Sequence, residues 1–310
     1  VEYLRQAARL DPKNKTVKAL SREHGFREFR GLWRSKAEIE AFEARREAIE
    51  TARTEQIRVA PDFALLYRGP FRFFTDVDTR QAKSTLEQMM ASVETHWRKY
   101  QEVMRPFDLA AASDLDVVLF AKQDDYLRSV GIPGSAGVYY TGRGVGYFFG
   151  EGGWNFSTML HEMTHQLNDK LLRGHGAEAW FEEGIAEYFG AGFLTQAGKR
   201  MELGRVDATR LRAFQEAVRG RGGRVIPLQR FVAMPRAELS GEFYAQAWAL
   251  LHYLMEVHPY GRAILFDYIE GHRTRRGAPI SDVLARYEYD LKSFEAEFLG
   301  YYRTGGAAGN

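Results

Sequence analysis

The feature that most constrains this chain is the run His161-Glu162-Met163-Thr164-His165. Residues i and i+4 of an α-helix lie on one face about one turn apart, so both imidazoles can reach a single metal ion. Asn155 is a suitable N-cap for such a helix. The apolar residues around the motif are Phe156, Met159, Leu160, Met163, Leu167 and Leu171. The pattern predicts a largely buried helix with His161 and His165 as metal ligands and Glu162 placed to act as a general base.

A third protein ligand has to come from another part of the chain. The metzincin pattern places a Gly and a His three and six residues after the second His, but Asn168 and Leu171 occupy these positions. The metzincin arrangement is therefore excluded. Each motif residue taken alone could be an ordinary core or surface residue, so the metal hypothesis depends on a matching second segment.

The segment from Trp180 to Tyr188 provides that match. With the HExxH run about twenty residues earlier, it resembles the second zinc helix of the gluzincin (peptidase MA-like) zinc metallopeptidases, whose pattern is Trp-x-x-Glu-Gly-x-Ala-x-Tyr. The resemblance implies one Zn²⁺ per chain, with Glu183 as third ligand. It also implies that Glu187, one turn later on the same face, holds a ligand histidine through its second ring nitrogen. Glu182, about 100° away around the helix, is the alternative ligand.

A later residue has a counterpart in the same family. Related gluzincins often carry a Tyr some sixty residues after the ligand Glu, and its hydroxyl binds the oxyanion of the reaction. Tyr244 lies 61 residues after Glu183 and is the corresponding candidate. The alternative is a packing role, since tyrosines in Ala- and Trp-rich helices commonly pack.

Two strand-like runs, 136–140 and 145–149, flank the Gly-containing turn at 141–144 and predict a β-hairpin. In gluzincins, the strand before the zinc helix is the sheet edge that binds an extended peptide substrate. The alternative is a purely structural hairpin. The Gly-rich turn segments lack a Lys-Ser/Thr ending, which argues against nucleotide binding.

The expected fold class is α+β. Two strands in 63–75, a helix at 79–104 and a strand at 114–121 precede the hairpin and the motif helix. This order resembles bacterial peptidase-MA-like domains of uncharacterised function over about residues 60–300, and implies a thermolysin-like gluzincin core: a small mixed sheet whose edge hairpin packs on the HExxH helix, followed by a mostly helical C-terminal lobe. The helices expected in that lobe are 206–218, 242–257, 260–270, 280–286 and 291–302.

Three domains are predicted: a helical repeat-like arm or linker at 1–58, the N-terminal lobe with the zinc site at 59–190, and the helical lobe at 191–310. The start of the arm resembles the end of a tetratricopeptide repeat at Gln6–Asn14, and the arm could bind a protein partner. The chain begins at Val1 without a signal peptide, so we expect a piece of a longer or processed protein. The sequence does not fix the compartment, although the resembled domains are often exported to the periplasm or beyond.

Composition excludes several classes of function. A formal charge of +2 over 310 residues gives no basis for nucleic-acid binding. The sequence contains no run of 18 apolar residues, so no membrane span is predicted. The absence of cysteine excludes disulfides and thiolate ligands.

The function that these observations predict is a zinc-dependent peptidase acting on peptides or proteins, in which Glu162 activates the attacking water. Endopeptidase activity is favoured over aminopeptidase activity, because the hairpin has no acidic residue suited to capture a substrate amino terminus. The alternative is a non-catalytic peptide- or protein-binding module whose metal is structural or absent.

Overall fold

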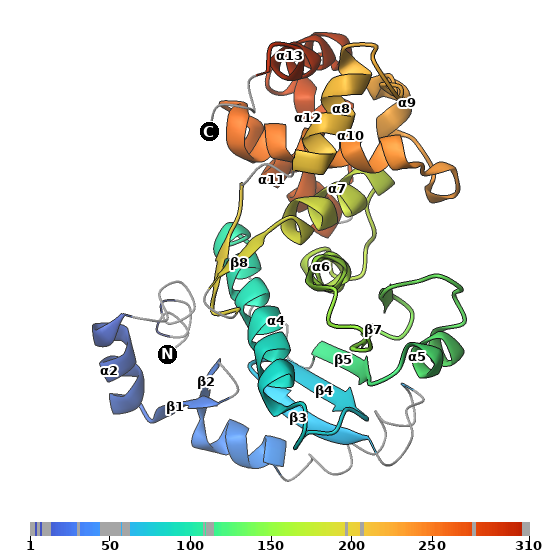
Figure 1. Ribbon diagram of the computed structural model, residues 1–310. Coiled ribbons are helices and arrows are strands. Elements are labelled where there is room, and N and C mark those ends of the chain that lie inside the picture. The colour runs from blue at the N-terminus through green and yellow to red at the C-terminus, as the bar shows by residue number, and fades with distance from the viewer. Residues whose placement is uncertain are drawn as a thin grey trace. The chain divides into compact units, whose positions relative to one another are not determined.

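A computed structural model gives the fold (Figure 1). The residues that it describes are 4, 7, 14–29, 32–43, 57, 63–107, 109, 115–195, 198–204, 208–274 and 277–305. Most of the repeat-like segment Gln6–Asn14 lies outside these residues. The chain forms two compact units, residues 1–166 with 196–200, and residues 167–195 with 201–310. The predicted domain boundaries at 58 and 190 stay predictions.

The first unit is built on a five-stranded mixed sheet in the order β3-β4-β5-β7-β6. Its central strands β4, β5 and β7 are parallel, while β3 and β6 pair antiparallel at the two edges. The β4 and β5 strands are buried along their whole length, as expected for strands rich in Phe, Val and Leu. The bounds are β3 Ala64–Arg68, β4 Phe71–Thr75, β5 Leu115–Phe120, β6 Val138–Tyr140 and β7 Val145–Phe149.

A buried ion pair lies within this sheet. Arg72 of β4 and Asp116 of β5 are direct neighbours in the parallel register, and the guanidinium donates to both carboxylate oxygens at 2.6 and 3.0 Å. Both residues are buried. The two-point geometry compensates two charges that would otherwise be costly to remove from water.

The helices in this part of the chain are α4 (Lys83–Val103), α5 (Gln123–Val130) and α6 (Phe156–Leu171). The α4 helix begins later than the predicted residue 79, because the Asp78 side chain accepts hydrogen bonds from the backbone of Arg80 and Gln81 and holds a turn there. The predicted N-cap of α6 is confirmed, since Asn155 Oδ1 accepts from Thr158 N at 3.1 Å.

The hairpin formed by β6 and β7 packs closely on α6. A methyl group added to Gly146 would lie 3.2 Å from Met163 Sδ, and one added to Gly137 would lie 3.1 Å from Thr158 Cγ2. Small residues at these two positions therefore let the hairpin approach the helix. The prediction of an α+β fold with a small mixed sheet, an edge hairpin on the motif helix and a helical C-terminal region is confirmed.

The second unit is mostly helical. Its central contact is between α7 and α10, where a Cβ added to Gly184 would lie 2.5 Å from Leu251 Cδ2 and 2.9 Å from the Ala247 carbonyl oxygen. The predicted helix at 242–257 divides into α10 and a π-helical turn, η2. The bounds are α7 Ala179–Gly190, β8 Phe193–Thr195, β9 Arg200–Glu202, α8 Ala208–Val218, α9 Leu228–Val232, η1 Arg236–Glu238, α10 Gly241–His252, η2 Tyr253–Val257, α11 Gly261–Arg273, α12 Ile280–Ala285 and α13 Leu291–Arg303.

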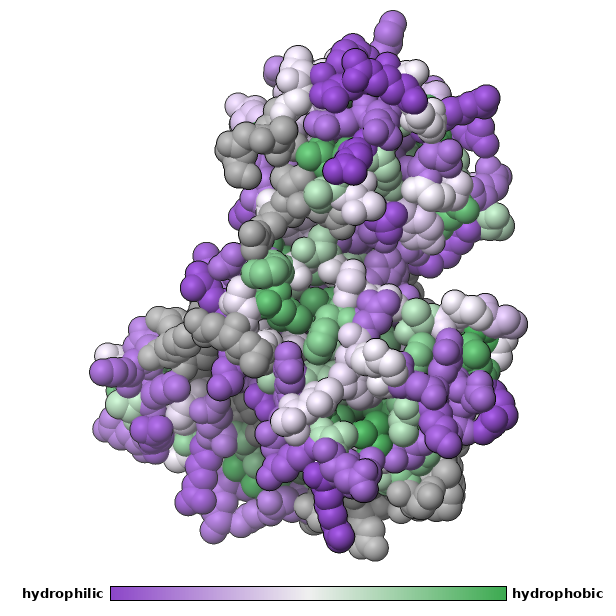
Figure 2. Space-filling model, in the orientation of Figure 1, coloured by the Kyte–Doolittle hydropathy of each residue, from purple (hydrophilic) through white to green (hydrophobic). Residues whose placement is uncertain are grey.

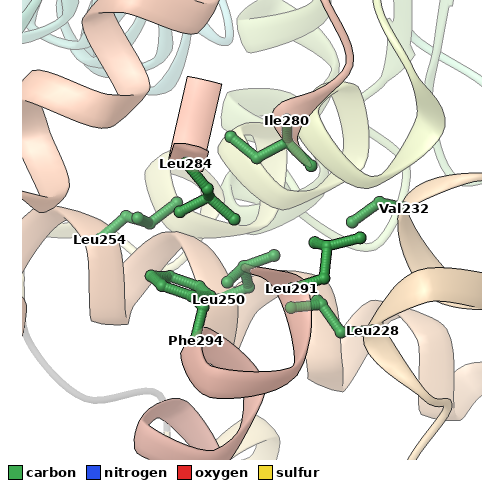
Figure 3. Close-up of a pocket in the computed structure, with 8 residues that line it drawn as sticks. All are labelled: Leu228, Val232, Leu250, Leu254, Ile280, Leu284, Leu291 and Phe294. Carbon is green, nitrogen blue, oxygen red and sulfur yellow. The ribbon is translucent and has the colours of Figure 1, made fainter. Parts of the chain in front are cut away.

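An apolar cavity lies inside this helical unit (Figure 3). Its lining comes from α9, α10, η2, α12 and α13 and has no ionisable or hydrogen-bonding side chain. The cavity is a packing feature of the helical core, not a place for acid–base or metal chemistry.

On the outside, hydrophilic residues cover much of the visible surface of α8 and α13 (Figure 2). Among the described residues, no helix has the length and hydropathy needed to span a membrane.

The N-terminal part differs from the prediction of a largely helical arm. After α2 (Lys15–Glu23), the chain forms a β-hairpin of β1 (Phe26–Phe29) and β2 (Leu32–Ser35), which pairs Phe26 with Ser35 and Phe29 with Leu32. Helix resumes at 36–43. The prediction was wrong because charged residues separate the apolar residues of these short strands. A strand needs apolar side chains on only one face, so the polar character of the segment did not exclude strands.

Candidate metal centre

The helices α6 and α7 bring three predicted ligands together. The His161 and His165 imidazoles and the Glu183 carboxylate each offer a ligand atom, and these atoms all lie within 4.8 Å of one another. Within the described part of the chain, no other group of three His, Cys, Asp or Glu residues meets this criterion. Glu183 is buried, whereas both imidazoles are partly exposed.

The histidine pair has the separation that zinc requires. The two Nε2 atoms lie 3.2 Å apart. Two nitrogens bound tetrahedrally to one zinc at about 2.0–2.1 Å would lie about 3.3–3.4 Å apart, so the imidazoles need almost no adjustment. The Glu183 ligand atom lies within 4.8 Å of the ligand nitrogens of both histidines. The two-nitrogen, one-oxygen donor set fits zinc, and with three protein ligands it leaves a coordination position open.

Neutral hydrogen bonds fix the orientation of α6. Thr164 Oγ1 donates its single proton to Leu160 O at 2.7 Å, so at 3.1 Å it accepts from His96 Nε2 of α4. Complete burial lowers the pKa of His96 to about 3, which keeps this ring neutral near pH 7. Gln166 Nε2 donates to Asp116 O at 3.1 Å and to Gly144 O at 2.9 Å. The motif helix is thus tied to α4, β5 and the hairpin turn.

Glu162 contacts the predicted substrate edge. Its Oε2 accepts a hydrogen bond from the backbone N–H of Tyr139 at 2.9 Å. Tyr139 is the middle residue of β6, the edge strand of the sheet. The carboxylate predicted to act as base is therefore oriented by the same strand that would align an extended peptide.

Two arginines pair with the carboxylates of α7. Arg236 Nη1 lies 2.8 Å from Glu183 Oε1, and Arg210 donates to both oxygens of Glu187 at 2.7 and 2.9 Å. The Arg210 guanidinium also lies 5.9 Å from the centre of the Tyr244 ring. The predicted contacts of Glu187 with a ligand histidine and of Tyr244 with an oxyanion stay predictions. The alternative ligand Glu182 accepts instead from Ala177 N at 3.2 Å and Asn168 Nδ2 at 3.4 Å, and it is not among the three clustered residues.

Sequence reasoning missed His96, Gln166, Arg210 and Arg236. His96 had a signal, since it is a polar residue within the buried stripe of α4. Gln166 directly follows the motif, and a polar residue on the buried side of an apolar helix predicts a hydrogen-bond partner. Arg210 and Arg236 had no such signal in the sequence, because the glutamates that they contact lie 23 and 53 residues earlier in the chain.

The fold and the cluster define an α+β protein with a candidate His-His-Glu metal centre. A family model described as a protein of unknown function (DUF1570) matches residues 155–277. This range begins at the N-cap of the motif helix and includes all four of His161, Glu162, His165 and Glu183. No curated protein matches the chain.

Proposed function

We propose that this protein is a zinc-dependent peptidase of the gluzincin type. The observation that carries the proposal is the His161-His165-Glu183 cluster with Glu162 on the same helix as the two histidines. A glutamate between the two ligand histidines adds a proton acceptor next to the ion, which a purely structural site does not need.

Each residue has a proposed part in the reaction. His161, His165 and Glu183 would hold the ion, and zinc bound there would supply Lewis-acid polarisation of the scissile carbonyl and acidify a water molecule. Glu162 takes the proton from the attacking water and passes it to the leaving amine. The β6 edge aligns the peptide, and the Tyr244 hydroxyl donates to the developing oxyanion.

The test is hydrolysis of internally quenched peptides, with blocked and with free amino termini, by wild type and Glu162→Gln. Loss of the general base should lower kcat by about 10²- to 10⁴-fold while about one zinc per chain is retained. Asp169→Asn, two turns along the same helix, is the matched control and should keep the wild-type rate. Cleavage of blocked peptides would support an endopeptidase. An undiminished rate for Glu162→Gln would refute the proposed mechanism, and zinc without any hydrolysis would favour the binding-module alternative.

A further inference from the structure

Arg236 is placed where it can act on a substrate. Its guanidinium is anchored to Glu183 Oε1 at 2.8 Å, yet 60% of its side chain is exposed, against 5% for Glu183. It belongs to the short η1 helix, which follows Pro235 and separates α9 from α10. The Arg236 guanidinium therefore contacts a proposed zinc ligand directly, while most of the Arg236 side chain is exposed to solvent.

The second arginine of this region differs in its bonding. Arg210 uses Nε and Nη2 together on Glu187 and is 34% exposed. Arg236 instead donates to Glu183 through Nη1 alone, so its Nε and Nη2 groups are not used in that contact. A guanidinium has five N–H donors, so Arg236 can bind a second carboxylate without releasing Glu183.

Charge explains why a second anion is favourable here. Zinc bound at Glu183 would share this carboxylate with the Arg236 guanidinium, and the two cations would repel each other because the single charge of Glu183 cannot fully compensate both. An anionic group that reaches Arg236 relieves this repulsion and forms a charge-assisted hydrogen bond. A peptide with a carboxylate close to the cleaved bond supplies such a group.

We propose that Arg236 is a specificity-determining residue that binds a substrate carboxylate, so that the preferred substrates are peptides with an acidic side chain or a free terminal carboxylate next to the scissile bond. This inference rests on the proposed peptidase function. The two sources of the carboxylate have the same chemistry and are separated by experiment.

The experiment profiles cleavage of a peptide library in which one position at a time is Glu, its neutral isostere Gln, Lys or Arg, each peptide made with a free and with an amidated C-terminus. The proteins compared are wild type, Arg236→Gln, Arg236→Glu and the control Arg230→Gln, which removes an exposed arginine 70% accessible in a loose 3.4 Å pair with Glu238. Binding of the same peptides to zinc-loaded Glu162→Gln, with and without Arg236→Gln, gives a second readout that needs no turnover.

Wild type and Arg230→Gln should prefer the carboxylate at one position by about 10- to 100-fold, and Arg236→Gln should lose that preference in both readouts. Arg236→Glu should favour Lys or Arg there instead. Loss on C-terminal amidation identifies a terminal carboxylate, and loss on Glu-to-Gln exchange identifies a side chain. An unchanged profile in Arg236→Gln overturns the inference and leaves the peptidase function standing, whereas no cleavage and no binding by any protein overturns both.

Discussion

The two helices that carry the proposed ligands are held by different kinds of interaction. The α6 helix is fixed by neutral, buried or partly buried hydrogen bonds that Thr164 and Gln166 form with α4, β5 and the hairpin turn. The α7 helix is fixed by steric contact at Gly184, while two of its three carboxylates, Glu187 and Glu183, pair with Arg210 and Arg236. The imidazoles should therefore be oriented independently of salt, whereas salt should weaken the ion pairs that the α7 glutamates form with Arg210 and the more exposed Arg236.

The largest expected effect comes from Gln166→Leu on α6. This change removes the donor to Asp116 O and Gly144 O and should lower the free energy of unfolding by about 2–4 kcal/mol, because two main-chain carbonyls lose a partner. Urea unfolding at 0.1 and 1 M NaCl should give the same loss. The exposed Gln123→Leu should change stability by less than about 0.5 kcal/mol. A loss in Gln166→Leu no larger than in this control would show that neutral hydrogen bonds do not hold α6.

A second test of α6 uses pH. Since the folded-state pKa of His96 is about 3 against 6.5 unfolded, the unfolded chain binds the extra proton between these values. The stabilisation is therefore complete above pH 6.5 and is lost as pH falls toward 3. Between pH 7.5 and pH 5 this group should cost about 2 kcal/mol, a dependence that His96→Asn should remove and His24→Gln should not. Identical pH profiles for wild type and His96→Asn would contradict a buried neutral imidazole.

The steric contact of α7 predicts a somewhat smaller change. Gly184→Ala places a Cβ 2.9 Å from the Ala247 carbonyl oxygen, a backbone atom that cannot easily move, and should destabilise by about 1–2 kcal/mol. Gly300→Ala in α13 meets nothing within 4 Å and should stabilise by up to about 1 kcal/mol through helix propensity. Thermal and urea unfolding would measure both. Equal stabilisation by the two alanines would mean that α7 and α10 do not approach this closely.

The smallest effect is expected for Arg210→Gln. Its pair with Glu187 is one-third exposed on the arginine side, so its removal should cost about 1 kcal/mol or less at low salt and still less at 1 M NaCl. Unfolding at both salt concentrations tests this. A cost that did not change with salt would place the α7 pair in the same class as the α6 bonds and remove the contrast between the helices.

The sequence predicted the parts of the molecule whose signals are local. The helix around His161 and His165, its cap at Asn155, the β6–β7 hairpin and the α+β class all follow from periodicity, capping and turn residues. The N-terminal hairpin from Phe26 to Ser35 was missed because charged residues such as Arg27, Glu28 and Arg34 interrupt its apolar residues.

The site was predictable only in part, for a physical reason. His161, His165 and Glu183 have a fixed spacing along two helices, so their convergence can be anticipated. Arg210 and Arg236 reach α7 through tertiary contacts across 23 and 53 residues, and no local pattern encodes such a meeting. Ion pairs that depend on tertiary contacts are thus harder to predict from a sequence than the residues that would ligate the metal.

The proposed metal centre is tested most simply by the zinc content of purified wild type, Glu183→Ala and Glu182→Ala, measured in parallel by mass spectrometry. We expect about one zinc per chain in wild type and in Glu182→Ala, and loss or strong weakening of zinc binding in Glu183→Ala. Full zinc in Glu183→Ala, or no zinc in the wild type after incubation with excess metal, would contradict the His161-His165-Glu183 centre.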